Sequence, residues 1–129
     1  TKYIFTKFPS GKEANFFSIM SKGTIALSLF FMWYMQMVDG IQFMFIDEFD
    51  SYFHHGVSRK LIEKLKKSPT QVILTTHNTA NMSNSILRPD SYFTISNNNI
   101  ANIAERSGRE IRQAQNIEKM YRAGSFENE

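Results

Sequence analysis

Two apolar segments of this sequence, Ile41–Ile46 and Gln71–Thr76, each run directly into a group of polar residues. Both are rich in aromatic or β-branched residues, a pattern typical of strands that are covered on both faces in a parallel sheet. Between them, Ser58–Lys67 carries Leu61 and Leu65 at helical spacing, which predicts an amphipathic helix. The order strand, helix, strand predicts a right-handed parallel crossover, so both strands should end at the same edge of one sheet.

The rest of the chain adds elements around this crossover. We expect short strands or irregular structure over residues 1–20, and then a helix over Ile25–Val38 that is apolar on nearly every face. The later elements expected are a helix over Asn78–Ser85, a hairpin over residues 91–103 that turns at Asn97–Asn99, and a helix over Ile111–Arg122 that stops at Gly124. Together they predict a single domain over residues 1–129 with a three-layer α/β fold and parallel core strands.

Composition excludes several classes of protein. With 129 residues, 42% of them hydrophobic and 21% charged, the chain has the balance of a soluble globular domain. It has no cysteine, which excludes disulfides and favours a reducing compartment, so we expect a cytoplasmic protein. The apolar run Thr24–Val38 contains Ser28 and Gln36 and is shorter than the roughly 20 apolar residues that a membrane span needs. We therefore expect a buried helix there and no membrane partner.

The acidic residues Asp47, Glu48 and Asp50 lie where the first strand should end, and His77 follows the second strand. In parallel α/β sheets the ligand crevice lies at the carboxyl ends of the strands, so the crossover should bring these side chains together. Adjacent carboxylates repel one another unless a cation holds them, and Mg²⁺ accepts one or two carboxylates while it keeps waters and phosphate oxygens. The pattern therefore predicts a site for a nucleotide phosphate with magnesium.

The run FMFI followed by Asp-Glu is the Walker B pattern of nucleotide hydrolases. In that pattern Asp47 would hold a magnesium-bound water, and Glu48 would polarise the water that attacks the γ-phosphate of ATP. Such a run also occurs by chance at the ends of core strands, so its interpretation depends on neighbouring motifs.

Two neighbouring motifs resemble those of ABC-type ATPases. Upstream, MSKGT resembles their signature motif, in which a hydroxyl, a glycine and a helix N-terminus suit an anionic phosphate. The matching residues are Ser21, Lys22, Gly23 and Thr24. Downstream, TTHN resembles their switch region, which implies that His77 points at the γ-phosphate. A plain helix N-cap would also explain Ser21, and a hydrogen-bonded histidine at a strand end would explain His77.

The segment IDEFDSYFHHG is similar to the run IDE-x-D-x-x-LHP that follows Walker B in the OLD-like AAA-15/AAA-21 ATPases. The resemblance implies that Asp50 is the D-loop residue that crosses a dimer interface and that His54 is the family's histidine. Phe53 replaces the usual leucine and His55 the usual proline, so the turn there departs from the family pattern. The C-terminal run N-x-x-x-x-Y-x-x-G-x-F of these ATPases is matched by Asn116, Tyr121, Gly124 and Phe126.

A phosphate-binding Walker A loop, G-x-x-x-x-G-K-[ST], does not occur in the sequence. Gly11 and Lys12 in PSGKEANFF lack the first glycine, the Ser/Thr and a preceding apolar strand. Because this family places its loop upstream of the signature helix, we expect the chain to be the C-terminal part of a larger P-loop NTPase, without its N-terminal Walker A lobe. The helix Ile25–Val38 should then expose a hydrophobic patch, and the chain alone should hydrolyse no ATP.

The resemblance implies ATP binding and hydrolysis by two such heads packed head to tail as a homodimer. Ser21 and Gly23 of one head would close over the nucleotide held by the Walker A loop, Asp47 and His77 of the other. ATP would then join the protomers, and hydrolysis would release them. OLD-like relatives often serve in bacterial or mobile-element defence and commonly partner with a nuclease or another effector.

Two other functions fit parts of the sequence. A metal-dependent nuclease could use Asp47, Glu48 and Asp50 with His54 or His55 as a two-metal site, although this leaves MSKGT and TTHN without a role. A non-hydrolysing interaction domain with the same fold is opposed only by the presence of Glu48. The basic residues that could contact DNA, or form an ordinary solvated helix face, are Arg59, Lys60, Lys64, Lys66 and Lys67.

Overall fold

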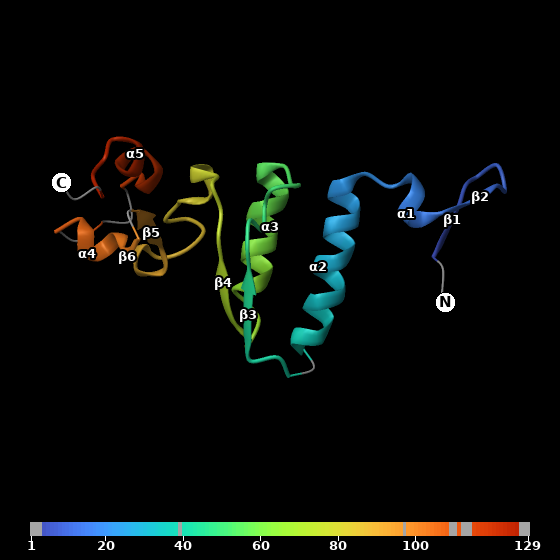
Figure 1. The fold of residues 1–129 in the computed structure, drawn as a ribbon, viewed down its shortest axis with the longest axis horizontal. Coiled ribbons are helices and arrows are strands. Elements are labelled where there is room, and N and C mark those ends of the chain that lie inside the picture. Colours follow the sequence, from blue (N-terminus) through green and yellow to red (C-terminus); the bar gives the residue numbers. More distant parts are fainter. Residues whose placement is uncertain (1–3, 39, 97, 109–110, 112–114, 127–129) are drawn as a thin grey trace. The chain divides into compact units, whose positions relative to one another are not determined.

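The structure, a computed structural model, describes residues 4–38, 40–96, 98–108, 111 and 115–126 (Figure 1). The chain forms two compact units. The first comprises Thr1–Phe45 and Ser68–Ile73, and the second comprises Ile46–Lys67 and Leu74–Glu129. Helices and short strands both occur along the chain, so it is a mixed α/β protein. The assignment of residues 1–129 to one domain stays a prediction.

The first unit begins with a short hairpin. β1 (Phe5–Lys7) pairs antiparallel with β2 (Glu13–Asn15), and the chain turns back at Gly11, whose φ of 80° suits glycine. A one-turn helix, α1 (Phe16–Ile19), follows because the side chain of Asn15 accepts a backbone N–H of its first turn at 3.0 Å. Short strands near the N-terminus agree with the expectation from the sequence.

α2 (Lys22–Val38) forms where the apolar run predicts a helix. It begins at Ser21, whose hydroxyl accepts the N–H of Thr24 at 3.2 Å and so satisfies one of the free donors of the first turn. Gly40, with a φ of 117°, follows its end. No helix among the described residues is both long and apolar enough to cross a membrane.

Several large apolar side chains of α2 are exposed. Among its described side chains only Phe30 and Met37 are buried. Its large exposed side chains are Leu29, Phe31, Met32, Trp33 and Met35. The expectation of a buried helix is therefore wrong for the described part of the chain, and the hydrophobic patch expected on this helix is present.

Two strands form a parallel sheet: β3 (Phe43–Ile46) and β4 (Gln71–Leu74). The N–H of Gln71 donates to the carbonyl of Gln42 at 2.9 Å, and the N–H of Thr75 donates to the carbonyl of Ile46 at 3.1 Å. The partner numbers rise together, so the strands run in the same direction, and the predicted parallel pair is confirmed (Figure 1). The polar residues that follow both strands therefore lie at the same edge of this sheet.

The connection between the two strands is α3 (His55–Leu65). The imidazole of His54 caps this helix, since its Nδ1 accepts the N–H of Gly56 at 3.2 Å. This cap explains why the helix begins before Ser58, where the sequence pattern places its start. The apolar side chains that α3 buries are Leu61, Ile62 and Leu65.

Described residues of the second unit form two hydrophobic clusters. One includes the last residues of both parallel strands and consists of Phe49, Ile62 and Ile86 with Ile46, Leu74 and Leu87. The other consists of Ile103, Ile111, Ile117 and Phe126 with Met82, Tyr92 and Met120. The segments that follow β3 and β4 therefore rest on packed apolar side chains.

The predicted hairpin is confirmed. β5 (Phe93–Ser96) pairs antiparallel with β6 (Asn99–Asn102), and α4 (Ile103–Arg106) follows directly. Asn98 in the turn has a φ of 61°, a conformation that asparagine adopts more readily than most residues. Asn97, the first residue of the predicted turn, lies outside the described residues.

The helix predicted over Asn78–Ser85 is wrong. Only one turn of 3₁₀-helix forms there, η1 (Thr79–Asn81). The side chain of Asn78 accepts the N–H of Ala80 at 3.1 Å, so a side chain takes the backbone donor that a longer helix would bond along its axis. A second 3₁₀ turn, η2 (Pro89–Ser91), follows further along.

The last helix, α5 (Ile117–Arg122), starts later than the predicted Ile111. The side chain of Asn116 accepts the N–H of Lys119 at 2.9 Å and caps the helix at this point, while residues 112–114 lie outside the described part. In the residues that the structure describes, the strands pair into two-stranded sheets, so the three-layer P-loop NTPase arrangement stays a prediction.

Candidate active site

The carboxyl ends of β3 and β4 bring polar residues together. Asp47 and Glu48 follow β3, and Thr75, Thr76 and His77 follow β4. The N–H of Phe49 donates to the carbonyl of Thr75 at 3.2 Å, so the two segments stay paired beyond the strands. This edge of a parallel sheet is where α/β proteins bind ligands.

Thr75 links the two acidic residues. Its hydroxyl donates to Oδ1 of Asp47 and accepts the N–H of Glu48 at 2.8 Å. The side chain that follows β4 therefore orients the carboxylate of Asp47 and fixes the backbone of Glu48. Both acidic side chains remain exposed to solvent.

Glu48 adopts an unusual backbone conformation. Its φ of 44° lies in the left-handed region, which costs a residue with a side chain roughly 1–2 kcal/mol relative to the right-handed helix. Ser51 supports it from the other side: the Ser51 N–H donates to the Glu48 carbonyl at 3.1 Å, and its hydroxyl donates to Glu48 Oε2 at 3.1 Å. Such conformations cluster at functional sites, where the surrounding structure holds them.

Glu48 and His77 point toward each other. The Nε2 atom of His77 lies 3.4 Å from Oε1 of Glu48, while their side chains are 92% and 56% exposed. An exposed pair of this kind contributes little to the free energy of folding, so a gain in folding stability does not explain why the two side chains face each other. A shallow hollow of about 300 Å³ lies beside the imidazole, and the residues that line it are Asp50, Ser51, His77 and Asn78.

Asp50 is bound within its own chain. Its Oδ1 accepts a hydrogen bond from the hydroxyl of Thr76 at 2.7 Å, and its Oδ2 accepts one from the side-chain amide of Asn81 at 2.8 Å. The Thr76 hydroxyl also accepts the N–H of Asn78 at 2.9 Å. Asp50 therefore lies beside the loop that carries His77, and its expected role across a dimer interface stays a prediction.

The residues of the MSKGT motif belong to the first unit. The hydroxyls of Ser21 and Thr24 lie 3.0 Å apart, and Ser21 caps α2 as described above. Lys22 and Gly23 form the first turn of the helix, and the Lys22 side chain is exposed. This local geometry is that of a helix N-cap, and phosphate binding by these residues stays a prediction.

Several residues of the site are not predicted by the sequence analysis. They are Ser51, Thr75, Thr76 and Asn81. The two threonines stand in the TTHN motif, where polar side chains at a strand end are a usable signal, whereas nothing in the local sequence marks Asn81. In the described part of the chain no three His, Asp or Glu side chains are grouped so that they could hold a metal ion together.

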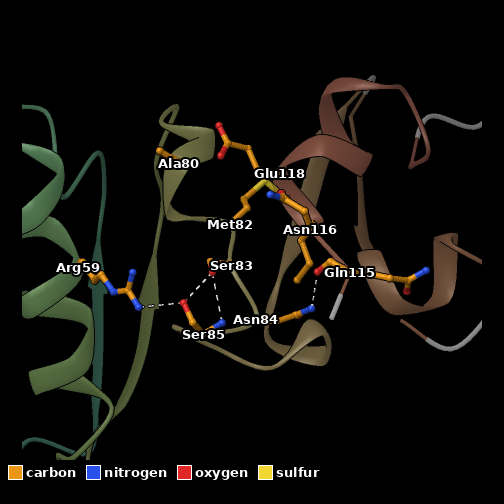
Figure 2. A pocket seen from close by; sticks show the side chains of 10 residues that line it. Arg59, Ala80, Met82, Ser83, Asn84, Ser85, Gln115, Asn116 and Glu118 are labelled. Atoms are coloured by element: carbon orange, nitrogen blue, oxygen red, sulfur yellow. Dashed lines mark hydrogen bonds between the residues drawn. The ribbon is translucent and has the colours of Figure 1, made fainter. Parts of the chain in front are cut away.

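A second hollow of about 330 Å³ lies in the second unit and has different lining residues (Figure 2). Hydrogen bonds tie its walls: Arg59 donates to the hydroxyl of Ser85 at 2.9 Å, and the side-chain amide of Asn84 donates to the carbonyl of Gln115 at 2.8 Å. These contacts join α3, the segment after η1 and the segment before α5. The polar side chains that line this hollow are thus used in hydrogen bonds that join parts of the second unit.

Tyr92 supports the same region. Its hydroxyl accepts the N–H of Ser83 at 3.0 Å and is within hydrogen-bond distance of the carbonyls of Asn81 and Ser83. Burial raises the pKa of the Tyr92 phenol above its ordinary value, because the phenolate would lose water. The neutral form is therefore favoured in the folded protein.

A comparison with protein families places the chain beside a known domain family. The model of the family described as "AAA domain, putative AbiEii toxin, Type IV TA system" matches residues 2–83, a range that contains the MSKGT motif, Asp47, Glu48 and His77. No curated protein matches the chain, and no solved structure does.

Proposed function

The chain belongs to the AAA-21 family of AAA domains, which are nucleotide-binding domains of ATPase type, and on that premise we propose that it supplies the hydrolytic residues of an ATP site. One observation carries the proposal. Glu48 and His77 follow neighbouring parallel strands, and Nε2 of His77 lies 3.4 Å from Oε1 of Glu48, whose backbone is held in a left-handed conformation.

Glu48 is the proposed general base. Its Oε2 is held by Ser51, while Oε1 faces His77 and solvent, so this oxygen can accept a proton from a water molecule. His77 is exposed and can donate a hydrogen bond from Nε2 to an anionic group such as the γ-phosphate of ATP. The two residues would thus orient the attacking water and the phosphate that it attacks.

Asp47 is the proposed contact to magnesium. Its carboxylate is exposed and is oriented through Oδ1 by the hydroxyl of Thr75. Oxygen donors of this kind fit Mg²⁺, which takes one or two protein carboxylates and completes its shell with water and phosphate oxygens. When bound, the ion would supply positive charge to the phosphates, and Asp47 would hold one of its waters.

A Walker A loop on polypeptide outside residues 1–129 is proposed to complete the site. The sequence contains no G-x-x-x-x-G-K-[ST] run that could surround the phosphates with backbone N–H groups. α2 exposes large apolar side chains, among them Trp33 and Met35, and a further lobe could cover them. The complete domain would then have the three-layer P-loop NTPase fold, and residues 1–129 by themselves would hydrolyse no ATP.

We propose further that two such domains bind ATP between them as a head-to-tail homodimer. In this arrangement Ser21, Lys22, Gly23 and Thr24 of one protomer face the nucleotide held by Asp47 of the other. Ser21 and Lys22 are exposed at the start of α2, which supports the proposal, because a helix N-terminus that carries a hydroxyl and a positive charge suits a phosphate. ATP would stabilise the dimer, and its hydrolysis would release the protomers.

The proposed setting is a cytoplasmic bacterial system for defence against phages or mobile elements. The description of the matched family, "putative AbiEii toxin, Type IV TA system", supports such a role. A nuclease or another effector is the proposed protein partner. Two of the basic residues that could contact DNA already bind within the chain, since Arg59 of α3 donates to Ser85 and Lys66, which follows α3, donates to the carbonyl of Ile86.

ATP hydrolysis by the complete polypeptide that contains residues 1–129 tests the proposal. We expect phosphate release that requires both ATP and Mg²⁺ and stops when EDTA removes the ion. Absence of ATP hydrolysis at any magnesium concentration would contradict the proposal. Manganese-dependent DNA cleavage that is lost in Asp50→Ala would instead support a nuclease.

A further inference from the structure

One carboxylate closes the loop that carries His77 at both of its ends. Oδ1 of Asp50 accepts from Thr76, which precedes His77, and Oδ2 accepts from Asn81, which follows it. The carbonyl of Asn78 accepts the N–H of Asn81 at 3.1 Å, so the loop is also closed along its backbone. The position of this loop therefore depends on Asp50.

Side-chain packing does not hold His77 itself. The imidazole is 92% exposed, whereas Asn81 is only 3% exposed. The position of the imidazole relative to Glu48 is therefore determined by the backbone on either side of His77. The contact between Asn81 and Asp50 is partly buried, whereas the contact between Thr76 and Asp50 is exposed, and a hydrogen bond to a carboxylate gains strength away from water.

The side-chain amide of Asn81 includes a buried oxygen that destabilises the fold. Its Oδ1 is buried without a hydrogen-bond partner in the described structure, while its Nδ2 donates to Asp50 at 2.8 Å. A buried polar atom without a partner destabilises the fold, and an apolar residue of similar size would avoid that cost. The amide, unlike an apolar side chain, donates a hydrogen bond to Asp50.

We propose that Asn81 is a positioning residue that acts through Asp50 to set the His77 imidazole opposite Glu48. Its effect on catalysis rests on the ATPase function proposed above, whereas its effect on the loop does not. The proposal also gives Asp50 a role inside its own chain. Displacement of a catalytic group by about 1 Å can lower a rate by about 100-fold, so this buried contact can matter for turnover.

An exchange of the two side chains tests the proposal. Asn81→Asp places two carboxylates against each other and should move the loop, because neither can donate a hydrogen bond. The double variant Asp50→Asn with Asn81→Asp restores a donor opposite an acceptor and leaves the Thr76 contact possible. Asn98→Asp adds the same negative charge in the exposed turn between β5 and β6 and serves as the control.

In the complete polypeptide we expect Asn81→Asp to lower kcat for ATP by about tenfold or more with KM changed less than about threefold. The double variant should recover most of the lost kcat, and Asn98→Asp should behave as the wild type. An unchanged kcat in Asn81→Asp, or a folded double variant that is no better than Asn81→Asp, would overturn the proposal. If Asn81→Asp does not fold, Thr76→Val removes the other contact to Asp50 and should lower kcat in the same way, and an unchanged kcat would overturn the proposal.

The imidazole resonances of His77 provide a readout that does not need ATP. They should shift in Asn81→Asp and return in the double variant. If the complete polypeptide hydrolyses no ATP but the resonances behave in this way, the proposed function fails and the positioning role stands. Resonances that do not move in Asn81→Asp would overturn the positioning role by themselves.

Discussion

The Nε2 atom of His77 lies 3.4 Å from Oε1 of Glu48, although the two residues follow different strands of the sheet. The parallel pairing of β3 and β4 brings them to one edge, and Thr75 holds Asp47 and Glu48 there. Both facing side chains are exposed, so the pair contributes little to folding stability.

His77→Ala should lower ATP turnover by the complete polypeptide by about 100-fold, because Nε2 would no longer face the phosphate. The fold should be unaffected, since the imidazole is 92% exposed. Steady-state phosphate release measures the effect, and His55→Ala, an exposed histidine at the start of α3, is the control. Equal turnover in both variants would exclude His77 from the mechanism.

Glu48→Gly should abolish hydrolysis and still make the protein more stable. Glycine removes the steric cost of the φ of 44°, which is worth about 1 kcal/mol. Glu63→Gly, in the interior of α3, should instead lower the free energy of unfolding by about 1 kcal/mol. Denaturant unfolding of both variants checks the contrast, and loss of stability in Glu48→Gly would show that the backbone there carries no strain.

Thr75→Val should weaken the response to magnesium. Valine has the shape of threonine but cannot donate to Asp47 or accept the N–H of Glu48. Loss of such a supporting contact typically weakens metal binding by about 10-fold or more. A magnesium titration of ATP turnover measures it, and Thr75→Ser, which keeps the hydroxyl, should remain close to the wild type. Identical titrations for valine and threonine would remove Thr75 from the site.

Tyr92 should make stability fall at high pH. Burial raises its pKa in the folded state, so the unfolded chain releases the phenolic proton first, near the ordinary value of 10.0. The stability contributed by the neutral phenol is complete below that pH and is lost as pH rises through the folded pKa. Denaturant unfolding across this range should show a smaller decline in Tyr92→Phe than in Tyr121→Phe, an exposed tyrosine. Equal declines would contradict the account.

The crossover could be predicted from the sequence because hydrophobic periodicity determines it. The runs Phe43–Ile46 and Gln71–Leu74 are apolar apart from Gln71, and the buried residues of α3 repeat at helical spacing. The helix expected over Asn78–Ser85 could not be excluded in the same way, since its failure depends on which side chain takes a backbone N–H.

Part of the candidate site could also be predicted from the sequence, because the hydrophobic runs show where the two strands end. Polar residues at the ends of two parallel strands must meet, so Asp47, Glu48 and His77 could be placed together. Thr75 and Asn81 act through contacts with residues far away in the sequence, and no local pattern reveals which acceptor they reach. The left-handed φ of Glu48 is likewise a result of the tertiary contacts around it.

Glu48→Gln tests the central claim most directly. The amide keeps the size of the side chain but cannot take a proton from water, so ATP turnover by the complete polypeptide should fall by about 100-fold or more while ATP affinity stays the same. Glu63→Gln, the same change on an exposed face of α3, should leave both unchanged. Turnover in Glu48→Gln equal to that of the wild type would contradict the account, because the base would then lie elsewhere.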